Sequence, residues 1–546
     1  MLGLAGLLRL YSSHYSLPTF FWGQGTRCNR ALKTQDGFRY NGRDHDLLDL
    51  LGTMSAMGCS VIVAGRKSLV VVAAASLVWL FCGCRTERPD SCAGVTAPTI
   101  IPAATAPGSS LVLNVKDFQA AGDATTDDTS AFSNALNKLA ENKGGTLLIP
   151  SGTYLVGDLK IGSGTWVKGT GDPLPILVKK RGANSILAIA SDPVGGVRPL
   201  VRNVSIERLT LHGRSVEDGF SEHTHNLYAV GIQQLTVHQV RFEAFQGDGL
   251  YVGPRMAENE KPAHNSDVKV TDNTFDGTNY QNRNGISVVD CTRCLLERNV
   301  FSHVSRADMP GAIDIEPDHR DEIVRDITIR KNTINDGHGN PGGLVISLNY
   351  KNFCEMPARI TVEKNHIQNV NVGITLVWLG APAKAESPGL RSVVRHNVVK
   401  QVDRGFILNG VEGLTVEDND FSATRNGGQI GVDLGAANVT FRKNNFKGLG
   451  TESGSGVMLY GPVTNVSFEG NDFTDLGSGT KQGSAIYFAR GVTREIRFTS
   501  NRFSSPQHLM RSAIDADESV SFNADTNTWR QNVLNDGIKP GTFPHQ

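Results

Sequence analysis

The sequence predicts an all-β protein, a right-handed parallel β-helix of about ten or eleven coils with a short helix capping its N-terminal end. Three observations predict this fold. An asparagine followed two residues later by an apolar side chain recurs at intervals of 22–33 residues. A short alternating strand precedes each asparagine, and a second strand that opens near glycine follows it. An amphipathic helical segment precedes the coils. The repeated asparagines are Asn273, Asn299, Asn332, Asn365, Asn397, Asn419, Asn444, Asn471 and Asn501.

The repeat favours a solenoid over other β folds. Two or more short strands per repeat with no helix between them cannot form a βαβ unit. Stacked coils, in contrast, bury an apolar interior that no single coil could bury. Asparagines at one slot could form a ladder that bonds to itself and to the backbone of the turns. A chain of 546 residues suggests several domains on length alone, but the repeat indicates that residues 111–546 form one elongated domain.

The start of this domain is expected to carry the cap that an exposed solenoid end needs. A helix is predicted over about 129–142, and Asp127, Asp128 and Thr129 offer oxygens for its N-cap. One face of this helix carries three apolar residues, Phe132, Leu136 and Leu139.

The same segment resembles a known family. VKDFQAAGDATTDDTSAF, followed by GGTLLIPSGTYLV, is similar to the opening of the pectate-lyase-like β-helix superfamily, which includes tailspike-type and polygalacturonase-related proteins. This chain departs from the usual pattern at Gln119 and Ala124, where glycine is common. The resemblance covers the mature chain and implies its fold. It leaves the chemistry open, since the superfamily holds hydrolases, lyases, epimerases and non-enzymes that act on or bind polysaccharides.

The N-terminal part is expected to direct export. Arg66 and Lys67 precede the apolar run SLVVVAAASLVWLF, which ends in Cys82-Gly83-Cys84. This pattern resembles a bacterial lipoprotein signal over 54–84, with Cys84 as the lipidated residue; plain secretion and an uncleaved anchor are the alternatives.

Two flanking segments complete this organisation. Residues 1–53 read as an extension ahead of the true start or an unstructured segment, and 85–110, rich in Pro, Ala, Thr and Ser, read as a flexible tether. The protein is therefore expected in the cell envelope, held to the membrane only by its lipid, or secreted.

Charge and cysteine usage exclude some partners. Lysine plus arginine equals aspartate plus glutamate at 54 each, which argues against a nucleic-acid partner. The lone Cys291-x-x-Cys294 is too little for a zinc site without a second pair. Cys294 falls in the slot that Val268 and Ile327 hold in neighbouring coils, so we expect a core residue and no metal.

Aligning the second strands predicts one acidic face. Their first apolar residues form an inward column, Leu250, Ile286, Ile313, Leu344, Ile374 and Phe406. Only the coil that reads GAIDIEPD carries acids in both outward slots, Asp314 and Glu316. Asp248 lies two coils earlier, and Arg283 and Asn284 lie one coil earlier. At about 4.8 Å per coil, Asp248 and Asp314 should lie about 10 Å apart at the backbone.

This grouping favours glycosidic-bond cleavage. Like charges raise one another's pKa, so one carboxyl can stay protonated while another ionises, as a glycosidase requires. We expect Glu316 to be the general acid and Asp314 or Asp248 the base or nucleophile, with Arg283 lowering the pKa of Asp314. GDG, RNG and GAIDIEP in adjacent coils also resemble the middle of β-helix proteins related to polysaccharide-cleaving enzymes.

Substrate-binding roles are predicted for five residues beside these acids: Arg283, Asn284, Tyr251, His319 and His338. His338 belongs to a G-H-G that resembles polygalacturonases, but the other segments of that pattern are absent, so a turn role is the alternative.

Three other interpretations remain. A polysaccharide lyase or uronate epimerase would use Arg283, His319 or His338 for proton abstraction and would hold Ca²⁺ with the acids; a hydrolase needs no cofactor. A non-catalytic sugar-binding protein would use aromatic platforms such as Tyr251, Trp378 and Tyr460. The outward acids could also serve solubility alone.

Overall fold

The computed structural model describes most of the chain after residue 110. The described ranges are 62–63, 69–70, 111–191, 199–254, 263–319, 322–349, 359–379, 392–422, 430–433, 437–450, 455–461, 463–477, 483–522 and 526–543. The chain divides into two compact units, Met1–Pro89 and Asp90–Gln546. Of the first unit, one antiparallel pair is described, β1 (Ile62–Val63) with β2 (Leu69–Val70). The rest of the expected signal, the extension 1–53, Cys84 and the tether lie outside the described residues.

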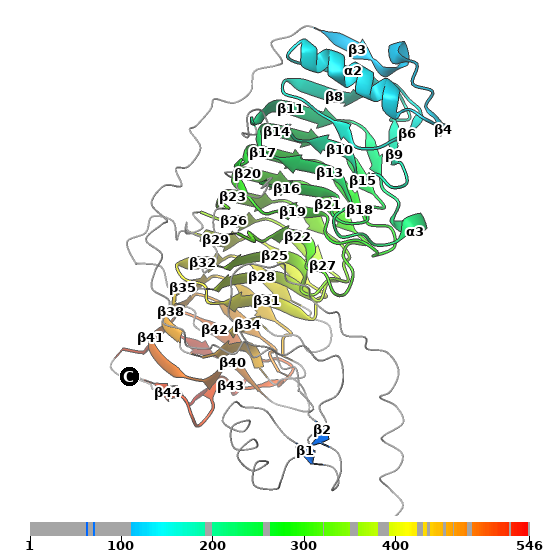
Figure 1. Cartoon of the computed structure of the whole chain (residues 1–546). Coiled ribbons are helices and arrows are strands. Elements are labelled where there is room, and N and C mark those ends of the chain that lie inside the picture. Colours follow the sequence, from blue (N-terminus) through cyan, green and yellow to red (C-terminus); the bar gives the residue numbers. More distant parts are fainter. Residues whose placement is uncertain are drawn as a thin grey trace, which may run out of the picture. The chain divides into compact units, whose positions relative to one another are not determined.

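The second unit is a parallel β-helix built from three sheets (Figure 1). Each typical coil contributes one strand to sheet 1, then a short strand to sheet 2, then a strand to sheet 3. Within the described residues these sheets have 16, 15 and 14 strands. The predicted fold class is confirmed. The stack is longer than the asparagine repeat suggests, because the coils before Asn273 lack that asparagine.

Sheet 1 precedes the asparagine turn. Its strands are β3 (Val112–Asn114), β5 (Gly145–Ile149), β8 (Thr165–Gly169), β11 (Val201–Glu207), β14 (Ile232–His238), β17 (Ser266–Thr271), β20 (Cys291–Glu297), β23 (Val324–Arg330), β26 (Thr361–Glu363), β29 (Ser392–Arg395), β32 (Leu414–Glu417), β35 (Ala437–Arg442), β38 (Val463–Glu469), β41 (Val492–Thr499), β44 (Ser521–Phe522) and β45 (Thr528–Arg530).

Sheet 2 follows the asparagine turn. Its strands are β4 (Asp123–Asp127), β6 (Thr153–Val156), β9 (Ile176–Lys179), β12 (Thr210–His212), β15 (Arg241–Glu243), β18 (Thr274–Asp276), β21 (Val300–Ser302), β24 (Thr333–Ile334), β27 (His366–Gln368), β30 (Val398–Lys400), β33 (Asp420–Ser422), β36 (Asn445–Lys447), β39 (Asp472–Thr474), β42 (Arg502–Ser504) and β46 (Val533–Leu534).

Sheet 3 holds the second strands of the repeat. Its strands are β7 (Leu159–Lys160), β10 (Ser185–Ile189), β13 (His225–Val230), β16 (Leu250–Gly253), β19 (Ile286–Val288), β22 (Gly311–Ile315), β25 (Gly342–Asn349), β28 (Val372–Leu379), β31 (Arg404–Asn409), β34 (Ile430–Asp433), β37 (Ser455–Tyr460), β40 (Gly483–Arg490), β43 (Met510–Ala516) and β47 (Lys539–Gly541).

The register of sheet 3 confirms the predicted columns. Ile313 pairs with Ile286 on one side and with Leu344 on the other, and all three side chains are buried in the core. Alternation along the strand then turns the neighbouring residues outward. Asp314 accordingly pairs with Ser287 and Val345 in the adjacent outward column.

The asparagine ladder is confirmed and links coil to coil. The Nδ2 of Asn332 donates to Oδ1 of Asn365 at 3.0 Å and to the carbonyl of Leu296 at 2.9 Å. Its Oδ1 accepts from the backbone and side-chain N–H groups of Asn299. The same pattern continues to Asn532. Because the ladder is buried, water cannot reach the polar backbone groups of these turns, and the asparagine side chains supply their hydrogen bonds instead.

The N-terminal cap is the predicted amphipathic helix. α2 spans Thr129–Glu141 and buries its apolar face at the end of the stack (Figure 1). It follows the 3₁₀ turn η2 (Val115–Phe118). The expected capping role of Asp128 is wrong, since its carboxylate accepts from the backbone N–H groups of Ala121 and Gly122 and makes no cap hydrogen bond to the helix.

The two departures from the family's glycine pattern keep the backbone shape of glycine. Gln119 and Ala124 both have φ of 69°. This left-handed conformation costs a non-glycine residue about 1–2 kcal/mol. The turn is therefore retained although the glycines are not.

The expected core role of Cys294 is confirmed. It pairs with Val268 and Ile327 in sheet 1 and is 2% exposed. Its partner is Cys291, with which it forms a disulfide. The buried disulfide accounts for the C-x-x-C without a metal.

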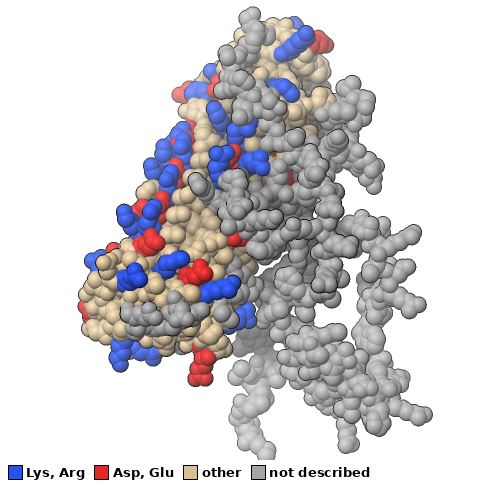
Figure 2. Space-filling model, turned by 90° about the vertical axis from the view of Figure 1, so that its left-hand side faces the viewer, with Lys and Arg blue, Asp and Glu red and all other residues tan. Residues whose placement is uncertain are grey.

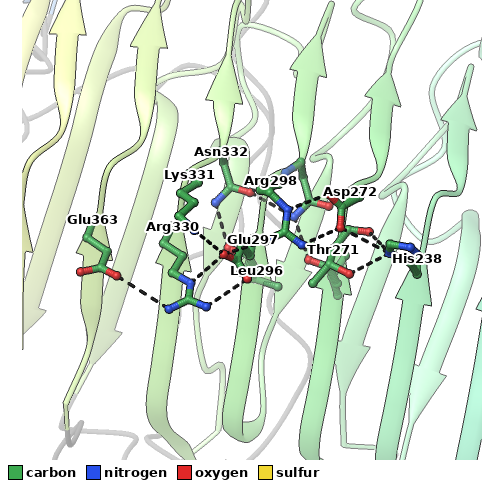
Figure 3. A network of polar contacts seen from close by, with 12 residues as sticks. His238, Thr271, Asp272, Leu296, Glu297, Arg298, Arg330, Lys331, Asn332 and Glu363 are labelled. Atoms are coloured by element: carbon green, nitrogen blue, oxygen red, sulfur yellow. Dashed lines mark hydrogen bonds and ion pairs between the residues drawn. The ribbon is translucent and has the colours of Figure 1, made fainter.

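The outer face of sheet 1 carries a column of alternating charge. At the last position of successive strands the register pairs acid with base, in the order Glu297, Arg330, Glu363, Arg395, Glu417, Arg442 and Glu469. We call these seven residues the charge column. Figure 2 shows Lys and Arg side chains interspersed with Asp and Glu on this face. Figure 3 shows the network around Glu297, which Arg330 and Lys331 both contact at 3.1 Å.

Candidate active site

The predicted acidic residues gather on the outward side of sheet 3, around one arginine. Arg283 enters from the loop before β19, and its Nη1 lies 3.4 Å from Oδ2 of Asp248, which precedes β16. Its Nη2 lies 3.7 Å from Oδ2 of Asp314 on β22. Its Nε lies 3.6 Å from Oε1 of Glu222, a residue of the loop that follows the short helix α3 (Ser215–Asp218). Asp248, Arg283 and Asp314 come from three successive coils and lie together as the sequence predicts, and Glu222 joins them from a loop.

Arg283 and its two aspartate partners are largely buried. Asp248 and Asp314 are 0% and 2% exposed, and the Arg283 side chain is 19% exposed. Charges removed from water are stable only when they are paired and hydrogen-bonded. The carboxylates raise the pKa of Arg283 against the opposing effect of burial, which keeps it charged.

Asn284 and Ser287 complete the polar contacts between the coils. Nδ2 of Asn284 donates to Oδ2 of Asp314 at 3.2 Å and to Oγ of Ser287 at 2.9 Å. Oδ1 of Asn284 accepts from the backbone N–H of Gly311 at 3.0 Å. Nη1 of Arg283 also donates to Ser287 at 3.1 Å. Asn284 therefore orients the Asp314 carboxyl and belongs to the cluster as predicted, although it is fully buried.

One oxygen of Asp314 is left over. Its Oδ1 is buried and has no hydrogen-bond partner among the described residues. An unsatisfied buried acceptor costs about 1–3 kcal/mol. Such an atom at the centre of a charged cluster is a candidate contact for a water or a ligand.

The carboxyls differ in their protonation. Burial raises the pKa of Asp248, but the positive charge of Arg283 and a hydrogen bond from His225 outweigh it, and the net pKa lies below its ordinary value. Burial and the charge of Glu316 raise the pKa of Asp314 well above its ordinary value, against Arg283. Arg283 does lower the pKa of Asp314, as expected, but burial and the charge of Glu316 outweigh it, so the carboxyl is not held in its ionised form. The shorter contact of Arg283 is to Asp248, and Asp314 has a second carboxyl two residues away.

Glu316 is the carboxyl that reaches a cleft. It follows β22, is half-buried, and lines a cleft of about 260 Å³. Burial and the negative charge of Asp318 raise its pKa, while Arg283 and a hydrogen bond with Ser347 lower it less. Its pKa therefore moves in the direction that the sequence predicts for a general acid, towards neutral pH.

A group of stacked rings lies beside Asp248. Tyr251 follows it on β16 and stacks on Tyr228 of β13 with 5.4 Å between ring centroids. His225 stacks on Tyr251 at 5.1 Å, and its Nδ1 lies 3.3 Å from Oδ2 of Asp248. Burial raises the pKa of Tyr251 above its ordinary value, so its hydroxyl stays protonated. The predicted aromatic contact at Tyr251 is thus part of a larger surface.

The turn after Glu316 is fixed by a buried acid. Oε2 of Glu322 accepts the backbone N–H groups of Asp318 and His319, the latter at 2.8 Å. Burial raises the pKa of Glu322 to about 8. His319 is exposed at this turn. Burial raises the pKa of Asp318, and the neighbouring Arg283 and His319 lower it less.

Three other predicted residues lie elsewhere. His338 stacks on Tyr280 with 3.7 Å between centroids, and its backbone N–H donates to Val304. Within the described residues its contacts lie at this turn and not at Arg283, which favours the turn role. Trp378 is 2% exposed and belongs to the core, so its proposed role as a surface platform is wrong. Tyr460 is half-buried at the end of β37.

Sequence reasoning missed His225, Ser287, Glu222 and Glu322. Ser287 was visible in the aligned outward column but was not singled out. His225 could have been found by extending that alignment one strand towards the N-terminus, since β13 pairs with β16. Glu222 and Glu322 lie in irregular loops, for which strand periodicity gives no position.

Within the described part of the chain, no group of three or more His, Cys, Asp or Glu side chains is arranged to hold a metal ion. None of the described helices has the length and apolar character needed to cross a membrane.

Known families match two overlapping parts of the chain. Residues 112–381 match the family described as rhamnogalacturonase A/epimerase, pectate lyase-like. Residues 324–537 match NosD, described as a periplasmic copper-binding protein. No match is found among curated proteins.

Three of the solved structures that are similar to this chain are an epimerase module, the catalytic unit of a glucanase and a phage tailspike. The A-module of the Azotobacter vinelandii mannuronan C-5 epimerase AlgE6 is 16% identical, with 79% of this chain and 96% of that chain covered and a TM-score of 0.39. The catalytic unit of a GH87 α-1,3-glucanase from Streptomyces thermodiastaticus is 16% identical, with 82% and 72% covered and a TM-score of 0.49. The tailspike of Escherichia coli bacteriophage HK620, solved with a pentasaccharide, is 14% identical, with 72% and 78% covered and a TM-score of 0.48.

Proposed function

We propose that this protein, whose residues 112–381 form a pectate-lyase-like β-helix, hydrolyses the glycosidic bonds of a polysaccharide on the outward side of sheet 3. One observation carries the proposal. Within a single cluster around Arg283, the pKa of Asp248 is lowered while those of Asp314 and Glu316 are raised. Asp314 and Glu316 lie two residues apart, and two neighbouring carboxyls that oppose each other's ionisation leave one protonated and one charged, as an acid–base pair requires.

Glu316 is the general acid in this proposal, since it is the carboxyl of the three that lines the cleft. Its proton passes to the glycosidic oxygen as the bond from the anomeric carbon to that oxygen breaks. Water then adds to the anomeric carbon, and a carboxylate takes the proton that the water loses. The products are one shortened chain with a new reducing end and one with a free hydroxyl.

Asp314 is favoured over Asp248 as the partner carboxylate. Both oxygens of Asp248 are within 3.5 Å of Arg283, whereas Oδ1 of Asp314 is unpartnered among the described residues. A single proton shared between Asp314 and Glu316 leaves one acid and one base. The role of Asp248 is then to hold Arg283 and, through it, the position of Asp314.

A polysaccharide panel tests the reaction. The full chain is incubated with neutral and acidic polysaccharides, and each reaction is measured both by new reducing ends and by ultraviolet absorbance. Hydrolysis gives reducing ends without absorbance. If reducing ends and ultraviolet absorbance increase at the same rate, the reaction is elimination and not hydrolysis.

Epimerisation or elimination is the second candidate, because the matched family description names an epimerase beside a hydrolase. Tyr251, whose hydroxyl stays protonated, would be its proton donor near Asp248. The described residues offer no group of three or more His, Cys, Asp or Glu for the Ca²⁺ that elimination would use. A non-catalytic sugar-binding role would rest on the Tyr228 and Tyr251 rings. The hydrolysis itself uses no cofactor.

Export is also proposed. The lipoprotein-like signal ending at Cys84 supports it, with membrane attachment through that lipid or release as a secreted protein. The buried Cys291–Cys294 disulfide supports it independently, since such bonds form mainly in oxidising compartments.

A further inference from the structure

The cleft beside Glu316 is lined by both apolar side chains and hydrogen-bond acceptors. Its floor is the outward side of β25 and β28, and its rim comes from the loops before β22 and β25. The lining residues are Asp308, Pro310, Glu316, Asn340, Pro341, Val345, Ser347, Thr375 and Val377. Four of these are apolar and two are carboxyls, while lysine, arginine and histidine are not among them.

The polar part of this lining is rich in acceptors. Glu316 and Asp308 present carboxyl oxygens, and Thr375 presents a hydroxyl. Thr375 is 4% exposed, and its Oγ1 has no partner among the described residues. A buried hydroxyl without a partner is rare in folded proteins, and at the floor of a cleft it indicates a ligand group that would satisfy it.

The arginines near the cleft are already engaged. Arg306 donates two hydrogen bonds to Asp308, at 2.9 and 2.7 Å, and its guanidinium lies 4.1 Å above the Phe220 ring. Arg283 is held between Asp248 and Asp314. Neither is free to neutralise a further carboxylate without breaking an existing pair.

We infer that this cleft is a subsite for an uncharged, hydroxyl-rich sugar residue and that it rejects a uronate. A neutral sugar donates hydroxyl protons to Glu316 and Thr375, and its C–H face packs on Val345, Val377 and the two prolines. A uronate brings a carboxylate that cannot donate, and no lysine, arginine or histidine of the lining can pair with it, so its loss of hydration is not compensated. This inference rests on the proposed function only in sharing Glu316.

Binding of matched monosaccharides tests the subsite without any cleavage. The full chain is presented with galactose and galacturonate, glucose and glucuronate, and mannose and mannuronate, and contact is read by saturation-transfer NMR. We expect the neutral member to give the larger signal in at least one pair. A larger signal from the uronate in every pair, or no signal from any neutral sugar, overturns the inference.

Two variants locate the binding. Thr375→Val keeps the β-branched shape of the side chain. It should weaken the binding of the neutral sugar about three- to tenfold, which corresponds to the loss of one hydrogen bond. Thr415→Val, on the outer face of β32 in sheet 1, is the matched control and should change nothing. Glu316→Gln should narrow the difference between the neutral sugar and its uronate. An unchanged difference in Glu316→Gln, or equal loss in both threonine variants, would place the sugar elsewhere.

These results are separable from the proposed reaction. If the polysaccharide panel shows no hydrolysis while the neutral sugar still binds through Thr375, the subsite stands and the reaction fails. If hydrolysis occurs but uronates bind the cleft more tightly, the reaction stands and the subsite fails.

Discussion

Nη1 of Arg283 lies 3.4 Å from Oδ2 of Asp248, and the aspartate is fully buried. The same guanidinium reaches Asp314 from a neighbouring coil. A single cation thus holds two buried carboxyls that come from strands separated by a third. The geometry of the site therefore depends on the stacking of these three coils, and the ion pairs of Arg283 in turn help to hold the coils together.

Replacing the two candidate catalytic carboxyls by amides should abolish turnover and spare the fold. Glu316→Gln and Asp314→Asn change volume little, while positioned acid–base groups contribute about 10²–10⁴-fold. We expect at least a 100-fold fall in the release of reducing ends by each variant, with an unchanged circular dichroism spectrum. If both variants keep near-full activity on a substrate that the parent cleaves, Glu316 and Asp314 are not the catalytic carboxyls.

Removing the central cation should destabilise the protein strongly. Arg283→Met leaves Asp248 buried without its main partner, and breaking a buried pair from one side costs about 3–5 kcal/mol. The thermal midpoint should therefore fall. The double variant Arg283→Met, Asp248→Asn removes both charges and should recover part of the loss. A double variant no more stable than the single one would mean that the ion pair is not the source of the effect.

An interior rung of the asparagine ladder should matter more than its end. Asn332→Ala leaves the Leu296 carbonyl and two N–H groups of Asn299 without partners, a loss of about 2–4 kcal/mol at roughly 1 kcal/mol for each bond. Asn532→Ala, at the less buried end, should cost less. Chemical denaturation and amide exchange near Asn299 give the measurement. Asn445→Ala is the control, because this half-buried asparagine of β36 lies outside the ladder and its side chain donates one hydrogen bond, to Asp420. Equal costs for Asn332 and Asn532 would contradict the ladder's role.

The acid in the charge column should make stability depend on pH. Burial raises the pKa of Glu297, but hydrogen bonds from Arg330 and Lys331 lower it more, so its folded pKa lies below the ordinary 4.5. Its stabilising effect is therefore present above 4.5 and is lost as pH falls through the folded value.

Because the three cations that contact Glu297 (Arg298, Arg330 and Lys331) are partly exposed, we expect Glu297→Gln to cost about 1 kcal/mol at neutral pH and little in acid. Unfolding midpoints at the two pH values give the comparison, with Glu141→Gln at the exposed end of α2 as control. A cost that is independent of pH would mean that packing, not charge, explains the effect.

The lipid anchor is tested at Cys84. Expressed in a bacterium, the protein should lose its first 83 residues and partition with membranes, because a diacylated cysteine holds a chain at a bilayer. Cys84→Ser should block processing or release the protein, as mass spectrometry and fractionation would show. Unchanged mass and membrane association in the variant would exclude this cysteine as the anchor.

Much of the fold and part of the site could be predicted because both follow from register. Once Ile286, Ile313 and Leu344 share an inward column, a period of two places Ser287, Asp314 and Val345 outside together. The same rule places Trp378 inside with Ile374, so its proposed surface role conflicted with the alignment itself.

What could not be predicted depends on loops and on burial. The raised pKa of Asp314 arises because its surroundings exclude water, and alternation alone marks that residue only as outward. Glu222 reaches Arg283 from a loop with no repeat, and Glu322 fixes the turn after Glu316 in the same way. Strand periodicity carries no information about either contact.

The charge column also limits how such a protein can change its length. Removing the single coil that contains Arg330 would bring Glu297 against Glu363, and removing the next would bring Arg330 against Arg395. Removing two adjacent coils would instead pair Glu297 with Arg395. Gene duplication or deletion within this stretch therefore preserves the alternation only in steps of two coils, which makes the pair, and not the single coil, its unit of growth.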